Sequence, residues 1–202
     1  ANPFVSFATS SPELFVSISA ILNDSSDIVF GNVIGSNIAN IALVLGITSL
    51  IFSVNISEKT LKFDFPFLLF STFFVGLVLF FFESVSFYSG FVFLLILSVF
   101  LYYIIEKSRN DINQEDNNQK LLKTSIVLNF GYVAIAIVML KFGADFLVDG
   151  AVEIANYFNL EERIIALTVV AIGTSVPELA TSIVAALKKE VDLAVGNIVG
   201  SN

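Results

Sequence analysis

Long apolar runs alternate with short polar stretches along this chain. The runs are 17 to 25 residues long, the length that an α-helix needs to cross the roughly 30 Å hydrocarbon core of a membrane. The strands of a membrane β-barrel would be only about 10 residues long and would alternate in polarity, a pattern that this sequence does not show. The pattern predicts membrane helices at 1–22 with a break, 31–52, 64–82, 87–106, 125–155, 163–187, and from about 192 onward.

Composition supports a membrane protein and restricts its chemistry. Hydrophobic residues make up 56% of the chain, charged residues 14%, and 22 of the 202 residues are Phe, while the mean hydropathy is +0.87. We therefore predict an all-α, polytopic membrane helical bundle in the lipid bilayer. Cys and His are absent from the sequence, which excludes thiolate and imidazole ligands. Any bound metal must therefore be one that prefers oxygen.

The positive charges predict an orientation in the membrane. Eight of the ten Lys and Arg residues fall in alternate loops on one side, one (Arg163) lies on the other side, and Lys141 lies inside a span. By the positive-inside rule the larger set is cytoplasmic. The larger set is Lys59, Lys62, Lys107, Arg109, Lys120, Lys123, Lys188 and Lys189. We expect a multi-pass protein of the plasma (inner) membrane, with residues 23–27 external. We expect no nucleic-acid partner and infer no obligate protein partner.

The longest polar stretch, residues 107–122, is too polar to enter lipid. It predicts a cytoplasmic connector between a first half, residues 1–106, and a second half, residues 123–202. The chain opens without a recognisable signal peptide. The first half also lacks a counterpart of residues 125–165. We therefore expect a fragment, with its first half truncated at the N-terminus and its second at the C-terminus.

Residues 8–37 and 173–202 are two copies of one segment at a constant offset of 165. Fifteen of the 30 aligned positions are identical, and both copies contain TS-x-PEL followed by GN-x-x-GSN. The copies lie five predicted spans apart, so they cross the membrane in opposite directions. Inverted repeats of this kind are typical of transporters, whose substrate site lies near the bilayer midplane where the repeats meet.

Each copy places polar oxygens beside a proline. On a helix, Thr9, Ser10 and Glu13 share one face. Pro12 removes a backbone N–H and opens the helix near Ala8, which frees carbonyl oxygens. The second copy repeats the arrangement with Thr174, Ser175 and Glu178 around Pro177. Hydroxyls, carbonyls and carboxylates without nitrogen or sulfur form a site for a hard cation such as Ca²⁺ or Na⁺.

The second motif adds a polar stripe. Asn32, Ser36 and Asn40 fall at i, i+4 and i+8, while Gly31 and Gly35 allow close approach to a neighbouring helix. Asn197 and Ser201 repeat the stripe, and the counterpart of Asn40 would be position 205, beyond the last residue of the chain.

Together, the two motifs in inverted copies resemble the α-repeats of the sodium/calcium exchanger family, within the calcium/cation antiporter superfamily. The resemblance implies a bundle with helices broken at the ion site and alternating-access exchange of Ca²⁺ for Na⁺, with no cofactor beyond these transported ions. It implies that the long helix at 125–158 slides as a gate. It also implies that a neutral Asn40 favours exchange without K⁺, because potassium-dependent relatives favour an acidic residue there. The implied cation ligands are Glu13, Glu178, Thr9, Ser10, Thr174, Ser175, Ser36, Ser201, Asn40 and the backbone carbonyls of Ser6 and Ala171.

Other functions remain open at this stage. Two buried glutamates could be neutralised by protons, which would give Ca²⁺/H⁺ antiport or exchange with another monovalent cation. A passive cation channel is less favoured, because a channel does not require inverted repeats. Catalysis is not expected, because the motif serines have no His or Lys base beside them to activate a nucleophile.

Overall fold

The computed structural model describes residues 3–53, 56, 58, 60–82, 85–112 and 126–202, which are almost entirely helical. The elements are α1 Pro3–Thr9, α2 Ser11–Leu22, α3 Ser26–Ala39, η1 Asn40–Leu45, α4 Gly46–Ile51, η2 Thr60–Asp64, α5 Phe65–Phe82, α6 Phe87–Ile112, α7 Ile126–Phe158, α8 Glu162–Ile165, η3 Ala166–Val170, α9 Ala171–Thr174, α10 Val176–Leu187 and α11 Val191–Ser201. The elements named η are π-helical turns within longer helices. The predicted all-α fold is confirmed.

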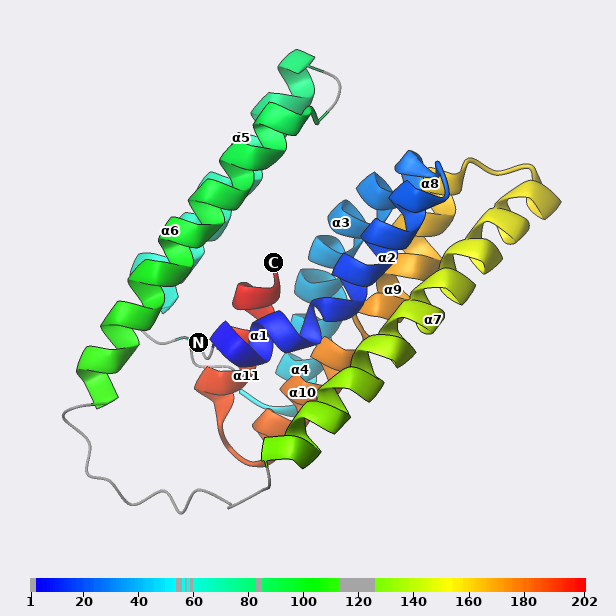
Figure 1. Ribbon diagram of the computed structural model, residues 1–202. Helices are drawn as coiled ribbons and strands as arrows, with labels where there is room; N and C mark the ends of the chain where they lie inside the picture. Colours follow the sequence, from blue (N-terminus) through cyan, green and yellow to red (C-terminus); the bar gives the residue numbers. More distant parts are fainter. Residues whose placement is uncertain (1–2, 54–55, 57, 59, 83–84, 113–125) are drawn as a thin grey trace. The chain divides into compact units, whose positions relative to one another are not determined.

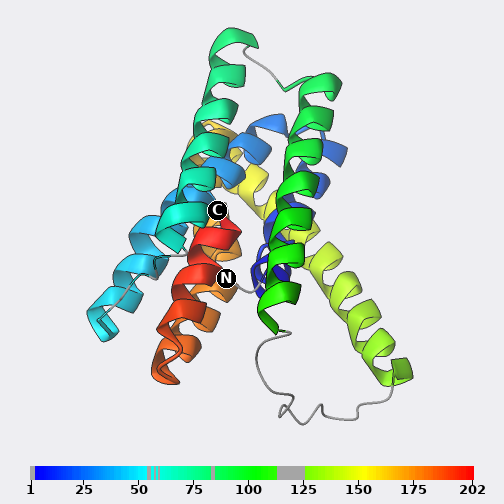
Figure 2. The ribbon, with the colours of Figure 1, turned by 90° about the vertical axis from the view of Figure 1, so that its left-hand side faces the viewer.

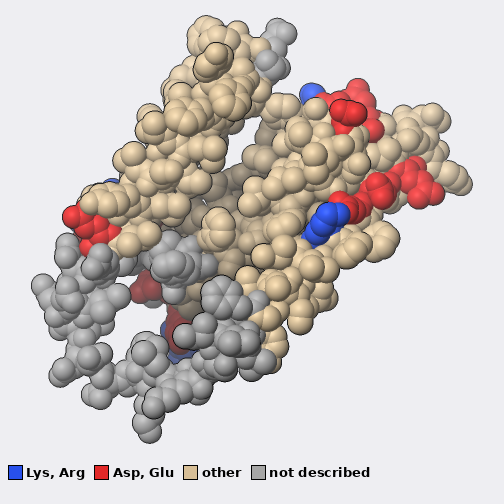
Figure 3. All heavy atoms as spheres, in the orientation of Figure 1, with Lys and Arg blue, Asp and Glu red and all other residues tan. Residues whose placement is uncertain are grey.

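Within the described residues, five helical stretches are long and apolar enough to cross a membrane: Ser26–Ile51, Thr60–Phe82, Phe87–Glu106, Gly131–Phe158 and Glu162–Leu187. Two shorter apolar helices, Ser11–Leu22 and Val191–Ser201, correspond to the first and last predicted spans. Figure 3 shows that uncharged side chains cover most of the described surface. The chain is a multi-pass integral membrane protein.

Several boundaries differ from the sequence prediction, and the two largest differences lie at the start of the second span and the end of α6. The second span begins at Ser26 rather than at residue 31, and Asp27 in its first turn interacts favourably with the positive end of the helix. Helix α6 continues to Ile112, so the first six residues of the predicted connector are helical. Residues 113–122 of that connector lie outside the described residues.

The predicted break of the first span is present. Helix α1 ends at Thr9 and α2 begins at Ser11, with Ser10 between them at φ −85° and ψ 7°. Figure 1 shows α1 leaving the line of α2 at an angle. In the second copy, Ser175 separates α9 from α10 with a closely similar conformation, φ −82° and ψ 0°. Each break falls two residues before a proline, as the missing N–H requires.

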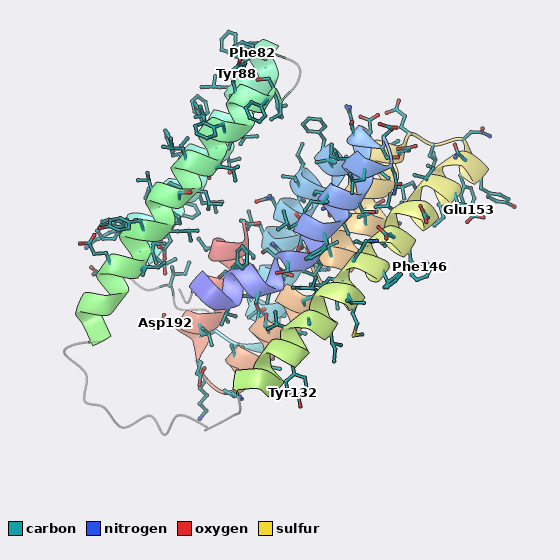
Figure 4. All side chains as sticks on the ribbon, viewed as in Figure 1. Phe82, Tyr88, Tyr132, Phe146, Glu153 and Asp192 are labelled. Carbon is teal, nitrogen blue, oxygen red and sulfur yellow. The ribbon has the colours of Figure 1, made fainter. Side chains whose placement is uncertain are left out.

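The chain divides into two compact units, one formed by residues 1–61 with 124–202 and the other by residues 62–123. The second unit is a hairpin of α5 and α6, in which Phe67 stacks on Phe100 with ring centroids 3.6 Å apart. Figure 4 shows Phe82 and Tyr88 together near the turn of this hairpin. Both side chains are strongly exposed.

The first unit contains both repeat copies. Helix α2 packs between α3 and α7, α3 packs on the run from α8 to α9, and α10 packs beside α11 (Figure 2). The core between α2 and α7 is built from small side chains, and in α7 these recur on one face. The α7 members are Ala144, Val148, Ala151 and Ala155.

Helix α7 is 33 residues long and therefore extends about 50 Å. Its charged residues recur every fourth position from Lys141 to Glu153, and Figure 3 shows blue followed by red along this helix. Lys141 forms an ion pair with Asp145 at 3.1 Å, as their i, i+4 spacing indicates. Figure 4 shows Glu153 on the outer side of α7.

Candidate cation site

The helix breaks bring the polar residues of both copies into one region of the first unit. Thr9 and Thr174 end α1 and α9, and Glu13 and Glu178 lie in the first turns of α2 and α10. The last turns of α1 and α9 contain the carbonyls of Ser6 and Ala171, at the helix end where partial negative charge accumulates. Ser36 lies in α3, Asn40 begins η1, and Ser201 ends α11.

Two hydrogen bonds cross between the copies in a reciprocal way. The Thr9 hydroxyl donates to Oδ1 of Asn197 at 3.2 Å, and the Thr174 hydroxyl donates to Oδ1 of Asn32, also at 3.2 Å. Thr9 and Thr174 are related by the offset of 165, and so are Asn32 and Asn197. Reciprocal contacts between equivalent positions are what a two-fold relation between the repeats produces.

Close packing of the helices follows the same relation. A Cβ added to Gly35 would lie 2.6 Å from the Cβ of Ala171, and one added to Gly200 would lie 3.0 Å from the Cβ of Ser6. Gly35 and Gly200 differ by 165, as do Ser6 and Ala171. The predicted close approach at Gly31 and Gly35 is therefore present, and α3 meets the backbone of η3 at this point.

Two further contacts join predicted ligands from opposite copies. The Ser10 hydroxyl donates to Oε1 of Glu178 at 3.1 Å. The amide of Asn40 donates to the Ser201 hydroxyl at 3.3 Å and to Oδ1 of Asn202 at 3.4 Å. Thus Ser10, between α1 and α2, contacts Glu178 of α10, and η1 contacts the end of α11.

Several oxygens in this region are buried but lack a hydrogen-bond partner among the described residues. They are both carboxylate oxygens of Glu13, Oε2 of Glu178, Oδ1 of Asn40, and the hydroxyls of Ser175 and Ser182. Glu178 is fully buried. A buried carboxylate without a partner is costly, so its charge must be neutralised by a cation or by a proton. The donor set consists of oxygen atoms, which fits a hard cation.

The remaining predicted ligands form hydrogen bonds with residues three or four positions away in the sequence. The hydroxyls of Ser36 and Ser201 donate to the carbonyls three residues earlier, each at 3.2 Å. The Ser6 carbonyl accepts from the backbone N–H of Ser10 and from the Thr9 hydroxyl. The Ala171 carbonyl accepts from Ser175 and Thr174 in the same way. These carbonyls therefore share their lone pairs with neighbours in their own helix.

Asn32 and Asn197 were placed on the polar stripe by the sequence pattern but were not among the predicted ligands. In the structure they are buried and connect the copies. Their recurrence in both copies of the GN-x-x-GSN motif distinguishes them from other polar residues. The motif could not indicate that their partners are the threonines of the opposite copy.

Comparisons with known proteins identify relatives of this chain. The family model described as sodium/calcium exchanger protein matches residues 3–106 and 128–202. Inner membrane protein YrbG of Escherichia coli is 35% identical over 206 residues, covering 98% of this chain and 63% of that protein. Putative antiporter CaxA of Alkalimonas amylolytica is 36% identical over 204 residues, covering 98% of this chain and 63% of that protein. A structure of the sodium-calcium exchanger NCX_Mj, soaked with 100 mM Na⁺ and 10 mM Sr²⁺, matches with a TM-score of 0.66 and 27% identity, covering 98% of this chain and 63% of that one. The chain therefore spans about two thirds of the length of these relatives.

Proposed function

Because the chain belongs to the sodium/calcium exchanger family, we propose that the full-length protein exchanges Ca²⁺ for Na⁺ across the plasma membrane by alternating access. The observation that carries this proposal is the pair of glutamates, one from each repeat, in which both carboxylate oxygens of Glu13 and Oε2 of Glu178 are buried without hydrogen-bond partners among the described residues. The similarity to a putative antiporter and to the structure of a sodium-calcium exchanger supports the proposal.

The charges explain why exchange is obligatory. Two carboxylates contribute −2, which one Ca²⁺ can neutralise and which Na⁺ ions can neutralise in its place. Since both ions use the same carboxylates, they bind in turn rather than together. An empty site would carry uncompensated charge within the membrane, so the empty protein resists the conformational change.

The breaks at Ser10 and Ser175 provide the place where conformation can change. Each break separates a short helix that carries threonine from a longer helix that carries glutamate. Helix α7 contacts α2 through small side chains, which allow one helix to slide along another. The Ser19 hydroxyl donates to Asp145 at 2.6 Å in this contact, so sliding of α7 must break that hydrogen bond.

Ion flux tests the proposed exchange. The full-length protein in sealed vesicles should accumulate radioactive Ca²⁺ when an outward Na⁺ gradient is imposed, and it should do so without K⁺. Uptake that follows a pH gradient but not a Na⁺ gradient would instead support Ca²⁺/H⁺ antiport. Ca²⁺ uptake that occurs without a Na⁺ or pH gradient, and that neither gradient accelerates, would indicate a channel.

Asn40 is expected to influence ion selectivity. Its Oδ1 is buried and lacks a hydrogen-bond partner among the described residues, and its amide contacts Ser201 of the other repeat. Asn40→Asp changes the site's charge by one without changing its size. We therefore expect this variant to alter the ratio of half-saturating Ca²⁺ and Na⁺ concentrations by about tenfold, measured by flux at varied Na⁺. An unchanged ratio would place Asn40 outside the site.

A further inference from the structure

The two threonine hydroxyls each have two acceptors within 3.2 Å, although each hydroxyl has only one proton. The hydroxyl oxygen of Thr9 lies 3.1 Å from the Ser6 carbonyl oxygen and 3.2 Å from Oδ1 of Asn197. Thr174 lies 3.2 Å from both the Ala171 carbonyl and Oδ1 of Asn32. In each case one acceptor is the carbonyl of the preceding turn and the other comes from the opposite repeat. The position of the proton decides which oxygen lone pairs remain available.

The orientation of the Asn32 amide is fixed by its other hydrogen bonds. The Asn32 amide nitrogen donates to the Glu13 carbonyl at 3.1 Å and to the Ser17 hydroxyl at 3.2 Å. A carbonyl can only accept, so the amide nitrogen must face Glu13, and Oδ1 must face Thr174.

The second repeat orients its asparagine in an equivalent way. The Asn197 amide nitrogen donates to the Thr181 hydroxyl at 3.0 Å, and the Thr181 proton has the carbonyls of Pro177 at 2.9 Å and Glu178 at 3.0 Å as acceptors. Asn32 therefore joins the Glu13 backbone directly to Thr174 of the other repeat. Asn197 contacts Thr9 of the other repeat and reaches the backbone of its own repeat through Thr181. Both asparagines are almost fully buried, at 0% and 3% exposure, so water does not compete for these bonds.

We propose that Asn32 and Asn197 are positioning residues of the cation site: each accepts the hydroxyl proton of a threonine from the other repeat and so turns oxygen lone pairs toward the cation. This inference rests on the proposed transport function. When the proton points to the asparagine, the threonine oxygen and the carbonyl of Ser6 or Ala171 can both bind a cation. Without the asparagine, the proton turns to that carbonyl and occupies the lone pair that its backbone hydrogen bond leaves open, so the cation loses the carbonyl as a donor.

The direct test is equilibrium binding of radioactive Ca²⁺ to the purified full-length protein. Asn197→Ala should raise the half-saturating Ca²⁺ concentration about five- to tenfold, the effect of losing one well-placed hydrogen bond. The matched control is Asn37→Ala on α3, whose amide donates to the Val33 carbonyl within its own helix at 2.7 Å. This control should change Ca²⁺ binding less than twofold. Equal effects of the two variants would overturn the inference.

A double-mutant comparison separates positioning from general packing. In a Thr9→Val background there is no proton to direct, so Asn197→Ala should weaken binding less than twofold further. In a Thr174→Val background the contact of Thr9 with Asn197 remains, so the full five- to tenfold effect should persist. The same effect in both backgrounds would show that Asn197 acts through packing alone and would overturn the inference.

The other repeat supplies an independent version of this experiment. Asn32→Ala should hardly change Ca²⁺ binding in a Thr174→Val background but should weaken it in a Thr9→Val background. This comparison tests the inference even if the Asn197 variants do not assemble. Size-exclusion chromatography identifies variants that fail to assemble. If the wild-type protein neither binds nor transports Ca²⁺, the proposed function fails. If the wild type is active and the asparagines show no coupling to the threonines, only this inference fails.

Discussion

Replacing Glu178 by Gln in the full-length protein is expected to reduce Ca²⁺ exchange on the order of a hundredfold or more, while the protein still inserts into the membrane. Gln keeps the size of the side chain but removes the charge that Ca²⁺ and Na⁺ share. Glu178 is fully buried and its Oε2 lacks a hydrogen-bond partner among the described residues, so nearby solvent or protein charge cannot replace the lost carboxylate. Glu13→Gln is expected to have an effect of the same order, measured by Na⁺-driven uptake of Ca²⁺ into vesicles.

The matched control is Glu153→Gln, which makes the same chemical change on an exposed position of α7. This variant should retain uptake within about twofold, since surface charges contribute little to a buried site. Wild-type uptake from either site variant, or an equal loss in the control, would refute the assignment of Glu13 and Glu178 as shared cation ligands.

Gly35→Ala is expected to lower the thermal midpoint of the detergent-solubilised full-length protein by about 5 °C or more. An added Cβ would lie 2.6 Å from the Cβ of Ala171 and 2.8 Å from the Leu167 carbonyl oxygen. These neighbours include backbone atoms, which cannot rotate away as a long side chain can. The helix that carries Asn32 and Asn40 would therefore shift from its place beside the second repeat, and Ca²⁺ binding should weaken with it.

Gly46→Ala provides the control for this substitution. An added Cβ at Gly46 has no heavy atom within 4 Å, and alanine favours a helix over glycine by about 1 kcal/mol. The midpoint of this variant should be unchanged or slightly higher. A similar fall in both variants would mean that loss of glycine flexibility, rather than close packing, explains the effect.

The sequence predicted the helices well because the membrane leaves few alternatives. Apolar runs of the right length must be helical where backbone groups cannot bond to water. A break in the first span followed from Pro12, although the sequence placed it near Ala8 and the structure has it at Ser10. The π-helical turns were missed. At Asn40–Leu45 and Ala166–Val170 the helices follow a wider hydrogen-bond pattern that depends on packing against neighbours, and no residue type specifies it.

The candidate site was partly predictable for a different reason. The repeated motif identified which side chains carry the chemistry, and the fixed offset of 165 indicated that the two copies are equivalent. The offset did not reveal the contacts between copies, because a two-fold relation pairs each residue with an unlike partner. Thr9 meets Asn197, and Ser10 meets Glu178. Such pairs become visible only when the helices are placed in space.

Anomalous X-ray diffraction from crystals of the full-length protein soaked in Sr²⁺, used in place of Ca²⁺, tests most directly whether one site serves both ions. We expect a strong peak within direct coordination distance of the carboxylates of both Glu13 and Glu178, which weakens as the Na⁺ concentration in the soak is raised. A peak that contacts neither carboxylate, or one whose height does not change with Na⁺, would contradict a shared cation site formed by the two repeats.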